Sequence, residues 1–300
     1  MLENRFDQAA MAIVRRAYAR QMLALAGVMD NGGLENAFAA VRREDFLEAP
    51  PWRFARALGY EILPGADPVL VYQDILLALA PDRSVNNGSP SLHAKWLHAV
   101  QPRSGERIVH VGAGAGYYTA IMAELVGERG SIIAIEVDPV LAKLARHNLK
   151  NHANVSVSTA DGMKALTEPV DVIYVNFAVE RPIKAWTDHL TIGGRLVFPL
   201  GVARRNRLGK TGRHSSHGAA LLVARTQVGL SVRWLGPAWF VCADGDAITT
   251  EAEQDALKAA FERGGVEFVR SLHWQASPPV DRIWHSGEDW HLSYEVIVDR

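Results

Sequence analysis

Three alternating glycines, Gly112, Gly114 and Gly116, stand between a short apolar run, residues 108–111, and a helix-like segment, residues 117–126. Glycine permits a positive φ and lets a ligand approach the backbone without a Cβ in between. The amides at the start of a helix favour electron-rich ligand groups. Strand, glycine turn and helix in this order therefore predict a binding site for a nucleotide-like cofactor.

The spacing of these glycines narrows the choice of cofactor. A dinucleotide fingerprint needs its third glycine where this chain has Tyr117, and here that glycine comes one residue early. A phosphate-binding P-loop needs a lysine followed by serine or threonine, and Tyr117-Tyr118 supplies neither. The spacing therefore disfavours a nicotinamide oxidoreductase and excludes a P-loop.

A second apolar run, residues 131–136, ends in the acid Glu136. A carboxylate at the end of this strand can accept hydrogen bonds from both ribose hydroxyls of a bound nucleoside. The alternative is a structural role for Glu136 beside Asp138, at the start of the next helix. We expect Glu136 and the adjacent Val137 to bind the cofactor.

Composition limits the class of protein. A chain of 300 residues with a net charge of −1 lacks the broadly basic character of a general nucleic-acid binder. The single cysteine, Cys242, excludes an internal disulfide framework and fits a reducing compartment. No apolar run approaches the roughly 18 residues that span a bilayer, and the early acids Glu3 and Asp7 argue against a secretory signal. We therefore expect a cytoplasmic protein with neither a membrane nor a nucleic acid as its partner.

The first hundred residues are predicted to contain helices and an irregular segment. Apolar residues at three- and four-residue steps form one stripe within residues 1–30, comprising Met11, Val14, Tyr18, Met22 and Leu25. This stripe is expected to pack on its own chain, with a homodimer contact as the alternative. A second helix is expected over residues 34–41, followed by irregular structure rich in proline and glycine. A polar turn, residues 84–94, precedes a third helix over residues 92–100, for which Ser89 or Ser91 is the candidate cap.

From residue 106 onwards, strands and helices alternate. Strands are expected to end near residues 111, 137, 159 and 176, and a fifth follows Gly193-Gly194. Two more, within 219–227 and 230–242, have no helix between them and predict an antiparallel hairpin. The pattern predicts an α/β fold: a Rossmann-like, seven-stranded, mostly parallel sheet with helices on both faces. We expect N-terminal helices in residues 1–100, a cofactor-binding core in 101–246 and a C-terminal α+β extension in 247–300.

The stretch 202–218 separates the fifth strand from the hairpin and is rich in arginine and lysine. It is interpreted as an exposed loop, with a basic flap near an anionic substrate as the alternative. His214 and His217 lie in it without a cysteine or carboxylate nearby, so no metal site is expected.

Several stretches together resemble the protein-L-isoaspartate O-methyltransferase family of class I S-adenosylmethionine-dependent methyltransferases, over about residues 34–245. The glycine turn with its following aromatic resembles the family's cofactor motif, and Ala160-Asp161-Gly162 stands where the family has Gly-Asp-Gly. Further similar stretches are residues 40–47, 72–77, 171–178 and 193–201. The resemblance implies S-adenosyl-L-methionine as the cofactor, and it implies that Asp161 meets the adenine amino group. The full set of expected cofactor-binding residues is His110, Gly112, Ala113, Gly114, Gly116, Tyr117, Glu136, Val137, Asp161, Gly162 and Asn176.

Two positions depart from the family pattern. His110 stands where an acid is usual. The family's active-site turn carries a serine two residues before its proline. A gapless alignment on Pro90 places Gly88 there, whereas a one-residue deletion places Ser89 there.

The expected activity is methyl transfer to a carboxylate of a protein, peptide or small molecule. The candidate catalytic residues are Ser89 and Ser91. One alternative is a methyltransferase with a different small-molecule or protein acceptor. The other is a protein that binds S-adenosyl-L-methionine without turnover.

Overall fold

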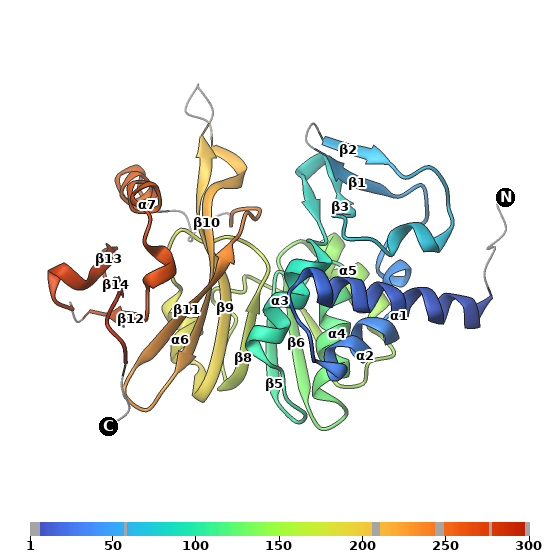
Figure 1. Cartoon of the computed structure of the whole chain (residues 1–300), viewed down its shortest axis with the longest axis horizontal. Coiled ribbons are helices and arrows are strands. Elements are labelled where there is room, and N and C mark those ends of the chain that lie inside the picture. Colours follow the sequence, from blue (N-terminus) through green and yellow to red (C-terminus); the bar gives the residue numbers. More distant parts are fainter. Residues whose placement is uncertain (1–6, 57–58, 206–210, 244–248, 276–277, 298–300) are drawn as a thin grey trace. The chain divides into compact units, whose positions relative to one another are not determined.

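The computed structural model describes residues 7–56, 59–205, 211–243, 249–275 and 278–297 (Figure 1). The chain divides into two compact units, Met1–Ala160 and Asp161–Arg300, which are called here the N-terminal unit and the C-terminal unit. The division into residues 1–100, 101–246 and 247–300 stays a prediction.

The N-terminal unit begins with two helices that pack on each other, α1 (Gln8–Leu25) and α2 (Gly32–Ala40) (Figure 1). Asp7 caps α1 and Asn31 caps α2 through side-chain oxygens that accept main-chain N–H groups. Met11, Tyr18 and Met22 of α1 are buried, so the predicted packing of this stripe on its own chain is confirmed for these three. Leu25, at the end of the stripe, is 66% exposed.

The segment between α2 and the third helix is more regular than the sequence predicts. Strands β1 (Arg53–Arg56) and β2 (Gly59–Ile62) form an antiparallel hairpin. The amide of Ala55 also donates to the carbonyl of Leu76, so the hairpin is held by a distant part of the chain. Such pairing leaves no local pattern in a sequence rich in proline and glycine. The remaining short elements are η1 (Arg43–Phe46), η2 (Pro68–Val71), β3 (Ala78–Ala80), η3 (Pro81–Arg83) and β4 (Val85–Asn86).

A parallel sheet completes the N-terminal unit, and β6 (Ser131–Glu136) lies between β5 (Arg107–Val111) and β7 (Val155–Thr159). The sequence of β6, Ser-Ile-Ile-Ala-Ile-Glu, is a near-continuous apolar run, as expected for a parallel strand covered on both faces. The helices are α3 (Pro90–Val100), α4 (Tyr117–Val126) and α5 (Pro139–Asn148). Asp138 caps α5 and Pro139 occupies its first turn, which explains why the chain turns into a helix directly after β6.

The C-terminal unit continues the expected strand order. Strand β8 (Val170–Val175) pairs in parallel with β9 (Leu190–Arg205), and a short helix, α6 (Lys184–Asp188), connects them. Strand β10 (Thr211–Arg225) pairs antiparallel with both β9 and β11 (Leu230–Pro237). The strands β5 to β11 are the seven that the sequence predicts, including the antiparallel hairpin.

The basic stretch 202–218 is mostly strand and only in part the expected loop. Strand β9 runs to Arg205 and β10 begins at Thr211, and residues 206–210 between them lie outside the described part of the chain. Val202 and Ala203 are buried, so the start of the stretch is no exposed loop. Pairing along two long strands extends the hairpin beyond what the apolar pattern alone reveals.

The C-terminal extension adds three strands to the free edge of β11. Strand β12 (Ser271–Trp274) pairs with β11, β14 (Trp290–Ser293) pairs with β12, and β13 (Ile283–Ser286) pairs with β14, all antiparallel. Helix α7 (Glu251–Arg263) precedes them, and its N-cap is Thr250. There the Thr250 hydroxyl accepts the Glu253 amide, and the Glu253 side chain accepts the Thr250 amide.

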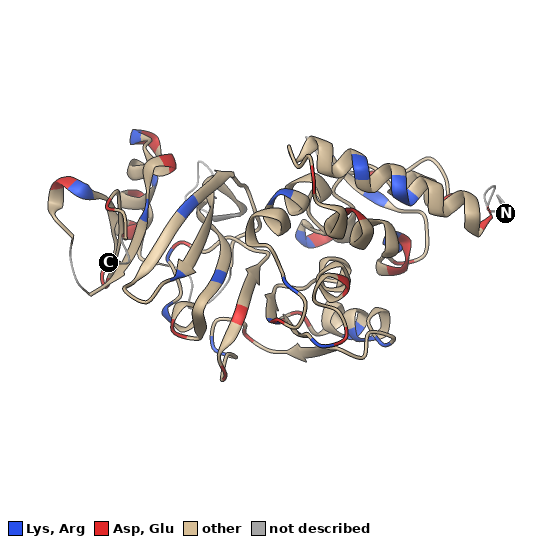
Figure 2. Cartoon of the chain, turned by 60° about the horizontal axis from the view of Figure 1, so that its bottom comes forward, with Lys and Arg blue, Asp and Glu red and all other residues tan. Residues whose placement is uncertain are grey.

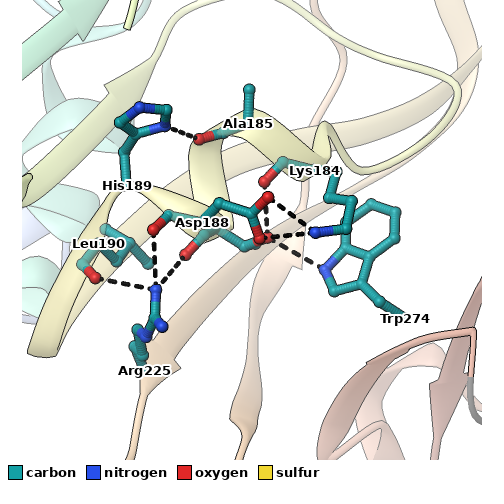
Figure 3. A network of polar contacts seen from close by, with 8 residues as sticks. Lys184, Ala185, Asp188, His189, Leu190, Arg225 and Trp274 are labelled. Atoms are coloured by element: carbon teal, nitrogen blue, oxygen red, sulfur yellow. Dashed lines mark hydrogen bonds and ion pairs between the residues drawn. The ribbon is translucent and has the colours of Figure 1, made fainter. Parts of the chain in front are cut away.

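Side-chain contacts also connect the C-terminal extension to helix α6 of the same unit (Figure 3). Trp274 of β12 donates its indole N–H to the Thr187 hydroxyl at 3.0 Å, and the Lys184 ammonium lies 5.9 Å from the centre of its ring. Arg225 of β10 donates hydrogen bonds to the carbonyls of Thr187, Asp188 and Leu190 (Figure 3). These bonds supply partners for carbonyls at the C-terminal end of α6, which have none within the helix. The extension is therefore held to β11 by main-chain pairing and to α6 by the contacts of Trp274.

Basic and acidic residues are interspersed along the described elements of both units (Figure 2). None of the helices in the described ranges is both long enough and apolar enough to cross a membrane.

Candidate active site

The glycine turn connects β5 to α4 in the way that the sequence predicts. Gly112, Gly114 and Gly116 have φ values of 75°, 56° and 94°, which side-chain-bearing residues rarely adopt. The amides of Gly112 and Ala113 both donate to the carbonyl of Ile135, at 2.8 and 3.1 Å. The turn is therefore tied to the end of the neighbouring strand, β6.

Close packing beneath the turn also requires glycine. A Cβ at Gly116 would lie 2.7 Å from Leu149 Cδ1, and one at Gly114 would lie 3.1 Å from Leu79 Cδ1. Gly116 immediately precedes α4, whose first-turn amides carry the positive end of the helix dipole. The turn therefore offers a close backbone approach next to a helix N-terminus, which is the arrangement that binds electron-rich ligand groups.

Glu136 lies directly against this turn. Its carboxylate accepts the amide of Gly114 on Oε2 at 2.7 Å and the amide of Asp138 on Oε1 at 3.0 Å. The side chain is buried, and burial raises the pKa of Glu136 while these amides act in the opposite direction. Val137, the next residue, is 70% exposed. The structure thus brings the predicted turn and the predicted acid together within the N-terminal unit.

His110 and Tyr117 point into the interior of the N-terminal unit. His110 is fully buried on β5, and its Nδ1 lies 2.7 Å from the Thr119 hydroxyl of α4. Burial lowers the pKa of His110 to about 3, so the ring is neutral at pH 7. Tyr117 is also buried, and its hydroxyl lies 3.4 Å from that of Tyr18. A direct contact of either residue with a cofactor stays a prediction.

The two candidate catalytic serines meet at one carboxylate, that of Asp74. Ser89 donates its hydroxyl to Asp74 Oδ1 at 2.8 Å, and Ser91 donates its hydroxyl to Oδ2 at 2.5 Å. The Ser91 amide donates to Oδ1 at 3.1 Å. Ser89 is the N-cap of α3, so of the two predicted caps, Ser89 and Ser91, the structure confirms Ser89. Because a hydroxyl has one proton, both serines then offer only lone pairs to a further ligand.

Gly88 lies between these serines and the buried core. Its φ is 75°, and a Cβ there would lie 2.4 Å from Nε2 of His93. His93 is buried in α3 and stacks on Tyr118 with ring centres 3.7 Å apart. The imidazole of His93 therefore occupies the space that a side chain at position 88 would need.

Three predicted cofactor residues belong to the C-terminal unit. Asp161 Oδ1 accepts the amide of Met163 at 3.0 Å, in a tight turn. Gly162 is buried, and its carbonyl accepts the indole N–H of Trp186 at 2.9 Å. Asn176 is half-buried directly after β8. Their contact with a cofactor stays a prediction.

A hollow of about 460 Å³ lies in the N-terminal unit between η3 and α5. Leu79 belongs to its wall and also lies against Gly114 of the glycine turn. Its apolar lining residues are Leu79, Ala80, Pro81, Val140, Leu141 and Leu144, and its charged or ionisable lining residues are Glu48, Asp82, Arg83, Lys143 and His147. In the described part of the chain, no group of three or more His, Cys, Asp or Glu side chains could hold a metal ion.

Sequence reasoning did not single out two residues of this region, Asp74 and Arg43. Both lie in stretches that resemble the family, 72–77 and 40–47, but a lone acid or arginine there carries no pattern of its own. Only the fold shows that Asp74 receives the serine hydroxyls and that Arg43 is buried beneath the same segment.

A parallel strand, a glycine turn, a helix and an acid on the next strand are arranged as in the α/β methyltransferases. Solved structures share this fold, and two of them are compared with this chain. A protein-L-isoaspartate O-methyltransferase superposes with a TM-score of 0.61 and 24% identity, covering 86% of this chain and 72% of that one. The protein from Plasmodium falciparum, described as a putative protein-L-isoaspartate O-methyltransferase in complex with S-adenosyl-L-homocysteine, gives a TM-score of 0.58 and 17% identity, covering 77% of this chain and 98% of that one.

The sequence comparison identifies the family. The sequence model of the protein-L-isoaspartate(D-aspartate) O-methyltransferase family matches residues 20–221. The chain therefore belongs to this family. It is 36% identical over 135 residues to protein-L-isoaspartate O-methyltransferase from Ignicoccus hospitalis, a match that covers 44% of this chain and 63% of that protein. Across three such relatives, the chain spans between 52% and 63% of their length.

Proposed function

We propose that this chain transfers a methyl group from S-adenosyl-L-methionine to the carboxylate of an isoaspartyl residue in a protein or peptide. The observation that carries the proposal is the contact between the Gly112–Gly116 turn and Glu136. Family membership over residues 20–221 supports it.

The residues of the turn fit a nucleoside cofactor. An ionised carboxylate has about four acceptor positions, more than the amides of Gly114 and Asp138 fill, so Glu136 can also accept ribose hydroxyls. The close packing at Gly114 and Gly116 keeps the turn free of side chains. We propose that exposed Val137 lies along the base. We also propose Asp161, Gly162 and Asn176 as cofactor-binding residues.

The cofactor supplies an electrophilic methyl group on a sulfonium. Held by the glycine turn and Glu136, it would supply this methyl group to the acceptor oxygen, and the electron pair of the broken carbon–sulfur bond would stay on sulfur. A carboxylate is already ionised at neutral pH and needs no general base. The work of the protein is then alignment of the two substrates, which can contribute about 7–11 kcal/mol. We place the Asp74, Ser89 and Ser91 cluster on the acceptor side.

This proposal is tested with methyl-labelled S-adenosyl-L-methionine and an isoaspartyl peptide, by counting base-labile methyl groups against a normal aspartyl peptide. Labelled ester above the aspartyl control supports it. Glu136→Ala should weaken cofactor binding measured by calorimetry, and an unchanged affinity would remove Glu136 from the site.

A second candidate is a methyltransferase with a different acceptor. The observation that favours it is the commitment of both serine hydroxyls to Asp74, because an acceptor carboxylate would meet lone pairs and a negative charge there. Cofactor binding without ester formation on the isoaspartyl peptide would favour this candidate or a non-catalytic binding protein. We propose no nucleic-acid partner, because basic and acidic residues are interspersed (Figure 2). A homodimer contact through α1 is also a proposal, supported by exposed Ile13 and Leu25.

A further inference from the structure

Arg43 is a fully buried arginine in the N-terminal unit, where it lies below the acceptor-side cluster. Its Nη1 donates to the carbonyls of Val71 and Gln73, at 2.6 and 2.7 Å. Its Nη2 donates to the carbonyl of Ile75 at 2.7 Å and lies 3.4 Å from Oδ1 of Asn87. One guanidinium therefore donates hydrogen bonds to the carbonyls of every second residue in a single segment, residues 71–75.

These contacts need an arginine and cannot be reproduced by lysine. The guanidinium is a planar fork with five donors, whereas an ammonium is a compact charge with three. All four hydrogen-bond acceptors named above are neutral oxygens, so the buried charge is stabilised by dipoles, three of which belong to the single segment 71–75. A cation held in this way fixes the shape of the segment that surrounds it.

The segment that Arg43 holds carries Asp74. The carbonyls of Gln73 and Ile75, on either side of Asp74, both accept from Arg43, while the Asp74 side chain is exposed and accepts from Ser89 and Ser91. Asn87 Oδ1 also accepts the amide of Leu77 at 2.9 Å. Arg43 thereby fixes both the Asp74 loop and the chain entering Gly88.

The same guanidinium reaches towards the glycine turn. Its carbon atom lies 5.8 Å from the ring centre of Tyr117, the residue after Gly116, and 5.9 Å from that of Tyr18. These are cation–π distances, and in a buried setting such contacts are among the stronger ones. Arg43 is therefore in contact with the acceptor-side loop on one side and with the first residue of α4 on the other.

We propose that Arg43 is a positioning residue that transmits cofactor binding at the glycine turn to the acceptor-side loop, residues 71–77. The inference rests on the proposed function, because it takes the Gly112–Gly116 turn as the cofactor site. A bound cofactor orders α4 at Tyr117, Arg43 holds its position against that ring, and the loop carrying Asp74 becomes fixed for the acceptor.

The test compares Arg43→Lys with Arg42→Lys. Arg42 is the adjacent residue, and its exposed side chain pairs only with Glu44 and Asp45 among the described ion pairs, so it is a matched control. Calorimetry with S-adenosylhomocysteine gives cofactor affinity, and hydrogen exchange of the peptide covering residues 70–78, with and without this ligand, reports the coupling. With the isoaspartyl peptide, KM and kcat are measured separately.

For Arg43→Lys we expect cofactor affinity within about threefold of the wild type and a rise in acceptor KM of about tenfold, the size that loss of charged hydrogen bonds gives. The protection that the ligand gives to residues 70–78 is lost, whereas Arg42→Lys behaves like the wild type. If Arg43→Lys does not fold, Asn87→Ala removes one Arg43 contact from the opposite side and should reduce the same protection.

Ligand-induced protection in Arg43→Lys equal to that in the wild type overturns the coupling. So does a wild type that binds the ligand without protecting residues 70–78. Calorimetry on the wild type alone tests the proposed function. If the wild type does not bind S-adenosylhomocysteine at all, the proposed function is refuted, and the inference about Arg43 is refuted with it. Normal binding and protection with no ester formed refutes the isoaspartyl acceptor but leaves the role of Arg43 intact.

Discussion

Substitution of Gly88 by alanine tests why this chain has a glycine in its acceptor turn. Two costs add at this position. The first is the backbone, because φ is 75° and alanine in the left-handed region costs about 1–2 kcal/mol, partly offset by about 0.4–1 kcal/mol from a less flexible unfolded chain. The second is the contact of the new Cβ with His93 Nε2, 2.4 Å away. Forcing an atom into a packed core typically costs about 1–3 kcal/mol.

Gly27→Ala supplies the control for the first cost alone. Gly27 has a φ of 71°, and a Cβ there would find nothing within 4 Å. We expect Gly27→Ala to lower the free energy of unfolding by about 1 kcal/mol and Gly88→Ala to lower it by about 2–4 kcal/mol. Urea denaturation followed by circular dichroism measures both. In a His93→Ala background, the effect of Gly88→Ala should fall to that of the control.

Equal losses for Gly88→Ala and Gly27→Ala would refute the reasoning, because they would show that His93 moves aside without cost. An undiminished loss in the His93→Ala background would refute it as well. The expected result would mean that His93 keeps position 88 free of a side chain.

Three further predictions concern pH and capping. Because burial raises the pKa of Glu136 above its ordinary 4.5, and ribose binding needs the ionised form, cofactor affinity should fall as the pH is lowered, starting at a higher pH than for an ordinary glutamate. Glu136→Gln should flatten this profile in calorimetry. His110 has a pKa of about 3 in the folded state and 6.5 in the unfolded state. Below pH 6.5 the unfolded chain therefore binds a proton that the folded chain does not, and the free energy of unfolding decreases as the pH falls. Between pH 7 and 5.5 this loss is about 1 kcal/mol, and His110→Asn should reduce the pH dependence of the free energy of unfolding by that amount, while buried His93 and His285 keep their own contributions. Thr250→Ala should cost about 1 kcal/mol through loss of the α7 cap, whereas Thr250→Ser should cost little in the same assay.

The local sequence pattern was sufficient to predict the strands β5 to β11 and the helices between them, apart from the long paired ends of β9 and β10. Apolar runs such as residues 131–136 and breakers such as Gly112 act locally, so their pattern predicts where a strand ends and a helix begins. The place of Glu136 followed for the same reason, because an acid at the end of one parallel strand must lie near the turn that follows its neighbour.

The construction of the acceptor side depends on contacts between segments that are distant in the sequence. Asp74 meets Ser89 and Ser91 across fifteen and seventeen positions of sequence, and Arg43 meets Ile75 across thirty-two. The same is true of the β1–β2 hairpin and of the strands that the extension adds to β11. Contacts between distant residues leave no periodicity in the chain, and each depends on side chains that become neighbours only after the segments have folded.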